Sequence, residues 1–168
     1  MSSSPRLYEL AANTPEGTFI AHYSEGGLVE LKFPGKAKIT RPNHLAQTVP
    51  KKILAWHAVT ESALKQILTG GNPSRLPPMA PTGTEFQCRV WAALRQIPSG
   101  QTKSYSEIAR LIGRPQAVRA VGGACGANPI PVLIPCHRVI AMNQKIGGFS
   151  GGLKWKRRLL RIEEVSGF

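Results

Sequence analysis

Apolar and polar residues alternate along two neighbouring segments near the start of the chain. The alternation runs through residues 18–23, breaks at Glu25-Gly26-Gly27 and resumes through residues 28–33. Alternation on both sides of a short glycine-containing break predicts an antiparallel β-hairpin. After a second break at Pro34-Gly35, a basic, proline-containing connection is expected to run to about Thr48.

The next apolar positions recur at helical spacing. They run from Ile53 to Leu68 and stop at Gly70-Gly71, which predicts one amphipathic helix. Residues 70–83 are then rich in Gly and Pro, which break regular structure. Such a composition is typical of a linker, so we expect two domains, one over residues 1–80 and the other over residues 81–168.

Two capping boxes follow in the second half of the chain. Residues 84–87 (Thr-Glu-Phe-Gln) and 104–107 (Ser-Tyr-Ser-Glu) both have the form S/T-x-x-E/Q and precede apolar positions at helical spacing. Gly113-Arg114-Pro115 then turns the chain into a further helical stretch, residues 116–126. Helix, glycine-containing turn and helix have the length of a helix-turn-helix unit, although any helical hairpin would fit this pattern.

Composition narrows the class of protein. The chain has 168 residues, of which 42% are hydrophobic, enough for one domain or two small ones. It contains no aspartate, which excludes sites that require one, such as an EF-hand loop. Residues 1–83 carry a net charge of +4 and residues 84–168 carry +9 out of the total of +13. This excess favours a polyanionic partner for the second half, although a merely soluble basic protein would also account for it.

The sequence indicates neither a membrane protein nor a secreted, disulfide-bonded one. No apolar run approaches the roughly 20 residues that cross a bilayer, and Met1–Pro5 do not begin a secretory signal. We therefore expect no membrane association and a cytoplasmic protein, or a nuclear one if the host is eukaryotic. Cys88, Cys125 and Cys136 are odd in number and lack C-x-x-C spacing, which argues against a disulfide framework and against a zinc site.

A cysteine stands directly beside a histidine and an arginine at Cys136-His137-Arg138. The run before it, residues 130–134, is apolar and β-prone, and it lies downstream of the candidate DNA-reading helix. A thiolate is a nucleophile, and a neighbouring base and cations lower the cost of forming it. The alternative is that adjacent side chains of an extended chain point in opposite directions, which would make Cys136 a core thiol and His137 a surface group.

The whole arrangement resembles the O6-alkylguanine-DNA alkyltransferases, also called methylated-DNA–protein-cysteine methyltransferases. Residues 135–139 (Pro-Cys-His-Arg-Val) match the active-site signature of that family, and residues 119–124 look like its recognition helix. Residues 86–87, 90–91, 97–105 and 148–153 also match in order, so the resemblance spans residues 82–164. It implies an N-terminal α/β domain of the ribonuclease H-like type and a mainly helical, winged-helix-like C-terminal domain that carries the helix-turn-helix, with no metal and no cofactor.

The resemblance also implies a reaction. A monomer would transfer the alkyl group of O6-alkylguanine in double-stranded DNA to Cys136, once and irreversibly, with O4-alkylthymine as a second candidate substrate. This is DNA repair by a suicide methyltransferase. His137 would act as the base on the thiol and Glu163 would orient it, although Glu163 could instead be a solvated acid at a helix end.

DNA contacts and a substrate pocket are implied as well. Arg119 would enter the base stack in place of the extruded nucleotide, next to Ala120 and Gly123, and Tyr105 would donate its phenolic proton toward the departing guanine. The residues that would line or support the pocket are Asn128, Pro131, Arg138, Val139, Phe149, Ser150, Gly151 and Lys156. Residues 154–158 are equally interpretable as a solvated basic face, and Arg138 as structural rather than catalytic.

Two rival functions remain at this point. Alkyltransferase-like proteins bind alkylated guanine without chemistry, but they have tryptophan where this chain has Cys136. A helix-turn-helix regulator could use Cys136 as a sensor and would bind a specific operator sequence. Two differences from the family pattern are Phe149, where many members have tyrosine, and an N-terminal half that matches only loosely.

Overall fold

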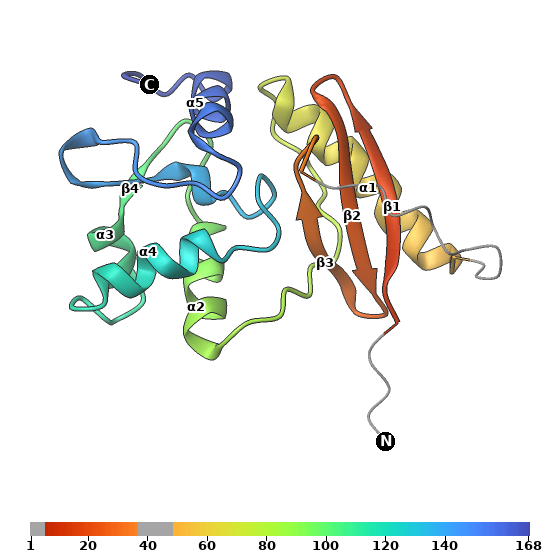
Figure 1. The fold of residues 1–168 in the computed structure, drawn as a ribbon, viewed down its shortest axis with the longest axis horizontal. Coiled ribbons are helices and arrows are strands. Elements are labelled where there is room, and N and C mark those ends of the chain that lie inside the picture. The colour runs from red at the N-terminus through yellow and green to blue at the C-terminus, as the bar shows by residue number, and fades with distance from the viewer. Residues whose placement is uncertain (1–5, 37–48) are drawn as a thin grey trace. The chain divides into compact units, whose positions relative to one another are not determined.

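The computed structural model describes residues 6–36 and 49–168. The chain divides into two compact units, Met1–Pro81 and Thr82–Phe168, which are described separately (Figure 1). The start of the chain, Met1–Pro5, and the basic connection expected before Thr48 lie outside the described residues.

The first unit is a three-stranded antiparallel sheet with one helix. The strands β1 (Tyr8–Thr14), β2 (Gly17–Ser24) and β3 (Gly27–Lys32) follow one another in the order β1-β2-β3, and helix α1 (Lys51–Leu68) packs on the sheet (Figure 1). The predicted hairpin is β2 and β3, and the predicted helix is α1, so both are confirmed. Strand β1 was not expected from the sequence.

The end of the predicted linker is bound to this first unit. Leu28 donates its backbone N–H to the Pro78 carbonyl and accepts from the Ala80 N–H, both at 2.8 Å. Gly27, with φ +143°, makes this approach feasible, because a Cβ there would lie 2.5 Å from the Pro78 oxygen. Residues 78–80 therefore form a short extension of the sheet rather than a free connection.

The second unit is mainly helical. Its helices are α2 (Glu85–Leu94), α3 (Tyr105–Leu111), α4 (Val118–Gly126) and α5 (Leu153–Ile162). Thr84 and Ser104 cap α2 and α3 with complete capping boxes, as the sequence predicts. A two-residue parallel ladder joins β4 (Lys103–Ser104) to β5 (Val139–Ile140) and brings the start of α3 beside the chain that follows the cysteine.

The apolar run before the cysteine is not a strand. It contains only an isolated bridge between Pro131 and Ile134, and a single-turn 3₁₀ helix, η1 (Cys136–Arg138), follows it. A second 3₁₀ turn, η2 (Met142–Gln144), comes after β5. Proline has no backbone N–H for a strand ladder, and residues 129, 131 and 135 are all proline, which explains why β-prone side chains do not form a strand here. The alternative of an extended chain with Cys136 in the core and His137 on the surface is wrong, because both residues lie on a helical turn and both are buried.

Two observations bear on function at the level of the fold. None of the helices within residues 6–36 and 49–168 is long and apolar enough to cross a membrane. In the same part of the chain, no group of three or more histidine, cysteine or acidic side chains is arranged to hold a metal ion.

Candidate active site

Cys136 begins η1 and is 3% exposed. The Asn128 side-chain amide donates to its sulfur at 3.1 Å and to the Ile134 carbonyl at 2.8 Å, and it accepts from the Ile130 N–H at 3.0 Å. Asn128 therefore fixes the turn between α4 and η1 and aims a donor at the thiol. Burial raises the pKa of Cys136 to about 11, against the hydrogen bond from Asn128 and the charge of Lys156, so the thiol is protonated near neutral pH.

His137 is fully buried and lies 2.8 Å from Glu163, measured from Nε2 to Oε1. Burial lowers the pKa of His137, although the hydrogen bond to Glu163 opposes this shift. The neutral ring therefore carries its proton on Nε2, where the carboxylate accepts it, and keeps a lone pair on Nδ1. Nδ1 is buried and has no hydrogen-bond partner among the described residues. The imidazole is thus poised to accept a proton.

Glu163 is buried at the end of α5 rather than solvated. Arg138 donates hydrogen bonds to the Glu163 carboxylate, from Nε to Oε2 at 2.9 Å and from Nη2 to Oε1 at 2.8 Å. Its Nη1 donates to the Ile97 carbonyl at 2.6 Å. Burial alone would raise the pKa of Glu163, but the hydrogen bonds from His137 and Arg138, together with the charge of Arg138, hold it at about 2. The carboxylate is therefore ionised beside the imidazole.

Lys156 lies on the buried side of α5. Its ammonium donates to the Val139 carbonyl at 2.6 Å and to the Gly148 carbonyl at 3.2 Å, and burial lowers its pKa to about 8. It joins β5 to the glycine-rich loop at residues 147–152. Its neighbours Lys154 and Arg157 are exposed, so the basic run divides between a buried member and a solvated face.

The glycine-rich loop lies against Tyr105 and the imidazole. Gly147 has φ +68°, and a Cβ there would come within 2.8 Å of the Tyr105 hydroxyl oxygen, so this close approach requires glycine. Burial raises the pKa of Tyr105 and keeps the phenol protonated. The Phe149 ring stands edge-on to His137, with centroids 6.5 Å apart. Of the other pocket candidates, Ser150 is exposed, and the buried ones are Pro131, Val139 and Gly151.

The predicted DNA-contacting residues form a second group. Arg119, Ala120 and Gly123 are exposed on α4, whose opposite side buries Val121, Ala124 and Cys125 in the unit. The helix is anchored by α2, because Trp91 donates its indole N–H to the Ala124 carbonyl at 2.9 Å. Most of the site residues expected from the sequence therefore separate into a cluster around Cys136 and an exposed group on α4, while Ser150 is exposed on the glycine-rich loop and belongs to neither.

Sequence reasoning missed the pairings that complete the cluster. Arg138 and Glu163 are 25 positions apart, and no local pattern links them. The carbonyls of Ile97 and Gly148, which accept from Arg138 and Lys156, leave no trace in a sequence, because every residue carries a carbonyl. Only the presence of buried cations that need acceptors could have suggested them.

Comparison with known proteins places the chain in a family. Residues 85–165 match the family described as 6-O-methylguanine DNA methyltransferase, DNA binding domain. A methylated-DNA–protein-cysteine methyltransferase of Methanosarcina acetivorans is 39% identical over 158 residues, which cover 94% of this chain and 98% of that protein. One from Mycobacterium bovis is 56% identical over 82 residues, covering 49% of this chain and 50% of that protein.

Solved structures of similar proteins match the fold of this chain over most of its length. The O6-methylguanine methyltransferase of Mycobacterium tuberculosis matches with a TM-score of 0.75 and 34% identity, covering 95% of this chain and 93% of that one. A complex of the Mycobacterium tuberculosis OGT protein with DNA matches with a TM-score of 0.71 and 35% identity, covering 92% and 91%. On full-length similarity in both sequence and structure, this chain belongs to the methylated-DNA–protein-cysteine methyltransferase family.

Proposed function

We propose that this protein repairs alkylated DNA by direct reversal, moving the alkyl group from O6 of guanine to Cys136 in one irreversible event. The observation that carries this proposal is the buried cluster itself: a thiol on η1 beside a neutral imidazole that is held by an ionised carboxylate. Membership of the methyltransferase family supplies the substrate class.

The proposed step moves one alkyl group and one proton. His137 accepts the thiol proton, directly or through a water, and Glu163 stabilises the imidazolium that forms. The bond from sulfur to the alkyl carbon forms as the bond from that carbon to O6 breaks. Tyr105, whose phenol is protonated, donates its proton to guanine as negative charge develops on the leaving group. The proton taken up by His137 then returns to the phenol through solvent, so the net transfer is one proton from the thiol to guanine. The product is a thioether, which water does not cleave, so each molecule acts once.

The residues around the thiol serve as the proposed pocket. Asn128 holds the turn that carries Cys136, and Lys156 ties Val139 to the glycine-rich loop. A carbonyl oxygen has two lone pairs, so Val139 can bind Lys156 and still accept from the exocyclic amine of guanine. Pro131 and Phe149 would form apolar walls, and Ser150 and Gly151 would approach the O6 side. O4-alkylthymine is a second candidate for the same pocket.

A base within a duplex cannot reach a buried thiol, so the lesion has to be flipped out. We assign this work to α3 and α4, as a helix-turn-helix of the winged-helix-like type. Arg119 is exposed on α4 and has a planar cation suited to fill the vacated place in the stack, while Ala120 and Gly123 are small enough to let the helix approach DNA closely.

We also propose a fold type for the first unit, a monomeric state and a compartment for the protein. The sheet and helix of the first unit would correspond to a ribonuclease H-like domain. The protein would act on double-stranded DNA as a monomer. A thiol that must stay reduced suits the cytoplasm, or the nucleus in a eukaryotic host.

The direct test uses a duplex containing a single O6-methylguanine. Excess wild-type protein should convert the lesion to guanine, measured by chromatography of the nucleosides after digestion. Cys136→Ser should restore none, whereas Cys88→Ser, which changes an exposed thiol, should restore guanine as the wild type does. Repair by Cys136→Ser would disprove the assignment.

Base extrusion has its own test. Arg119→Ala should slow repair of the duplex lesion about tenfold or more while the reaction with free O6-benzylguanine continues at the wild-type rate, because only the duplex reaction pays for unstacking. Equal losses on the two substrates would contradict a role in extrusion.

A further inference from the structure

Helix α5 has two faces of opposite character. Its buried face carries Lys156, Leu159 and Leu160. Its exposed face carries four cations at spacings i, i+3, i+4 and i+7, a pattern that aligns side chains along one side of a helix: Lys154, Arg157, Arg158 and Arg161. The alkyl-transfer mechanism uses none of these four.

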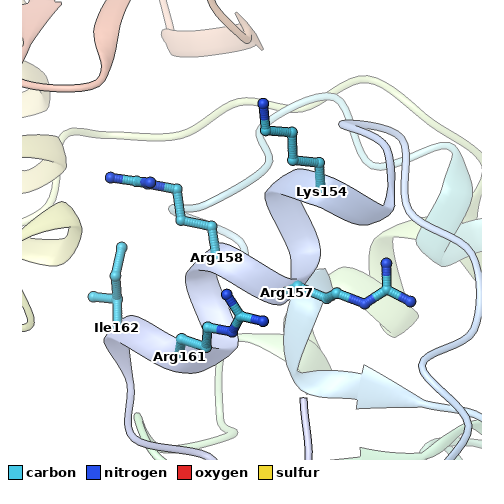
Figure 2. A pocket seen from close by; sticks show the side chains of 5 residues that line it. All are labelled: Lys154, Arg157, Arg158, Arg161 and Ile162. Atoms are coloured by element: carbon cyan, nitrogen blue, oxygen red, sulfur yellow. The ribbon is translucent and has the colours of Figure 1, made fainter.

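The four cations surround a hollow of about 510 Å³, to which Ile162 adds an apolar side chain (Figure 2). Figure 2 shows Lys154, Arg157 and Arg158 pointing in different directions from the helix rather than converging on one point. A convergent group would suit one small anion. An extended row of cations suits a ligand with several negative charges in line.

Two of the four cations are not neutralised by a carboxylate in the described part of the chain. Residues 153–162 contain no acidic residue, and no described carboxylate is in ion-pair contact with Lys154 or Arg157. Glu163, which follows the helix, is buried and bound to Arg138. The charges of Lys154 and Arg157 are therefore open to a ligand.

From this arrangement we propose that the exposed face of α5 binds a stretch of DNA phosphate backbone separate from the contact made by α4. Seven residues of helix rise about 10 Å, the axial length of about three phosphates of one strand. In Figure 1, α5 is at the top of the second unit, and α4 is a separate helix below it. The row of cations stands on a different helix from Arg119, and it would add phosphate binding without reading sequence.

This inference rests on the proposed function for the identity of its ligand, and the experiment keeps the two apart. A double variant, Lys154→Gln with Arg157→Gln, removes two exposed charges from α5. The matched control, Lys51→Gln with Arg75→Gln, removes two exposed charges from the first unit. Both should keep the wild-type unfolding midpoint, because all four side chains are exposed. Binding to an undamaged duplex is then measured by fluorescence anisotropy over a series of salt concentrations.

The α5 variant should lower the slope of log binding constant against log salt by about 2, since each phosphate contact contributes about 0.9, and the control should keep the wild-type slope. A wild-type slope in the α5 variant, as a surface for an acidic protein would give, overturns the inference. An equal decrease in both variants also overturns it, because net charge alone would then be responsible. The wild type is assayed in parallel with free O6-benzylguanine. Failure of that reaction counts against the proposed function, and its success alongside unchanged slopes counts against α5 alone.

Discussion

The two units of the chain bury polar side chains for different ends. In the first, the Tyr23 hydroxyl donates to Thr60 at 2.8 Å and lies 3.2 Å from Nδ1 of His57, and Thr60 in turn donates to the Trp56 carbonyl. Burial raises the pKa of Tyr23 to about 12, so this hydroxyl stays neutral. Every group in this network has a partner, and none is a nucleophile under ordinary conditions.

The second unit buries groups that are charged or reactive. A carboxylate, an ammonium, a thiol and an imidazole with one unpartnered nitrogen lie around η1: Glu163, Lys156, Cys136 and His137. Removing charges from water is unfavourable unless they are well paired, and replacing such pairs by apolar residues is often neutral or stabilising. We infer from this comparison that the polar core of the first unit serves stability, whereas that of the second unit retains groups for the proposed alkyl transfer.

The largest effect is expected when one histidine is replaced in each unit and the alkyl-transfer rates are compared. His137→Gln should slow alkyl transfer by a factor of about 10² to 10⁴, the usual contribution of a general base. His57→Gln should leave the rate unchanged, because its ring bonds the Ala11 carbonyl and Tyr23 in the other unit. The measurement is the single-turnover rate on a duplex lesion. Similar losses in both variants would mean that the two buried networks do not differ in role.

Acid titration separates the ionised network from the neutral one. The pKa of Glu163 is lowered from 4.5 to about 2, so its ionisation favours the folded state above pH 4.5 and loses this contribution as the pH falls toward 2. Glu163→Gln should therefore lower the free energy of unfolding by about 3 kcal/mol near neutral pH, and by progressively less through that window. Urea unfolding at a series of pH values measures the difference. A difference that does not change with pH would contradict an ionised, paired Glu163.

Two lysines of α5, Lys154 and Lys156, test whether the charge of Lys156 lowers the pKa of Cys136. Lys156→Met removes a charge that lowers the pKa of Cys136, so that pKa should rise above about 11 and alkylation of Cys136 at a given pH should slow several-fold. Lys154→Met, on the exposed face, should leave the profile unchanged. The readout is the rate of modification by a small alkylating reagent against pH, followed on the peptide that contains Cys136. Identical profiles for the two variants would show that the charge of Lys156 does not affect the pKa of Cys136.

The smallest expected effect concerns the first unit. Tyr23→Phe removes one buried hydrogen bond and should lower the free energy of unfolding by about 1 kcal/mol, without changing the alkyl-transfer rate. Chemical denaturation and the single-turnover assay check the two halves of this statement. A slower transfer would show that the neutral network supports catalysis after all.

Local signals in the sequence predicted much of the fold. The capping boxes at Thr84 and Ser104 and the apolar spacing of α1 locate three helices, because each signal depends on residues within one or two helical turns. The β2–β3 hairpin follows from alternation around a tight turn. Strand β1 escaped prediction because only Tyr8 and Ala12 of its seven residues are buried, which leaves a weak alternating pattern.

Contacts between distant residues set the limit of sequence reasoning. The resemblance over residues 82–164 named Cys136, His137 and Glu163 as a group, yet nothing in the sequence shows Arg138 bound to that carboxylate. The evenly weighted interpretations of residues 154–158 needed the burial of Lys156 to divide them. The apolar run at residues 130–134 misled because three prolines override the β propensity of its side chains.

The central claim is that the buried thiol of Cys136, rather than that of Cys88 or Cys125, takes the alkyl group. The three cysteines provide an internal comparison, since Cys88 is exposed while Cys125 and Cys136 are buried. Peptide mapping by mass spectrometry after reaction with an O6-methylguanine duplex should find about 14 Da added to the peptide containing Cys136 and none on the other two. A methyl group on Cys88 or Cys125 instead, or a lesion repaired with all three thiols unmodified, would contradict the account.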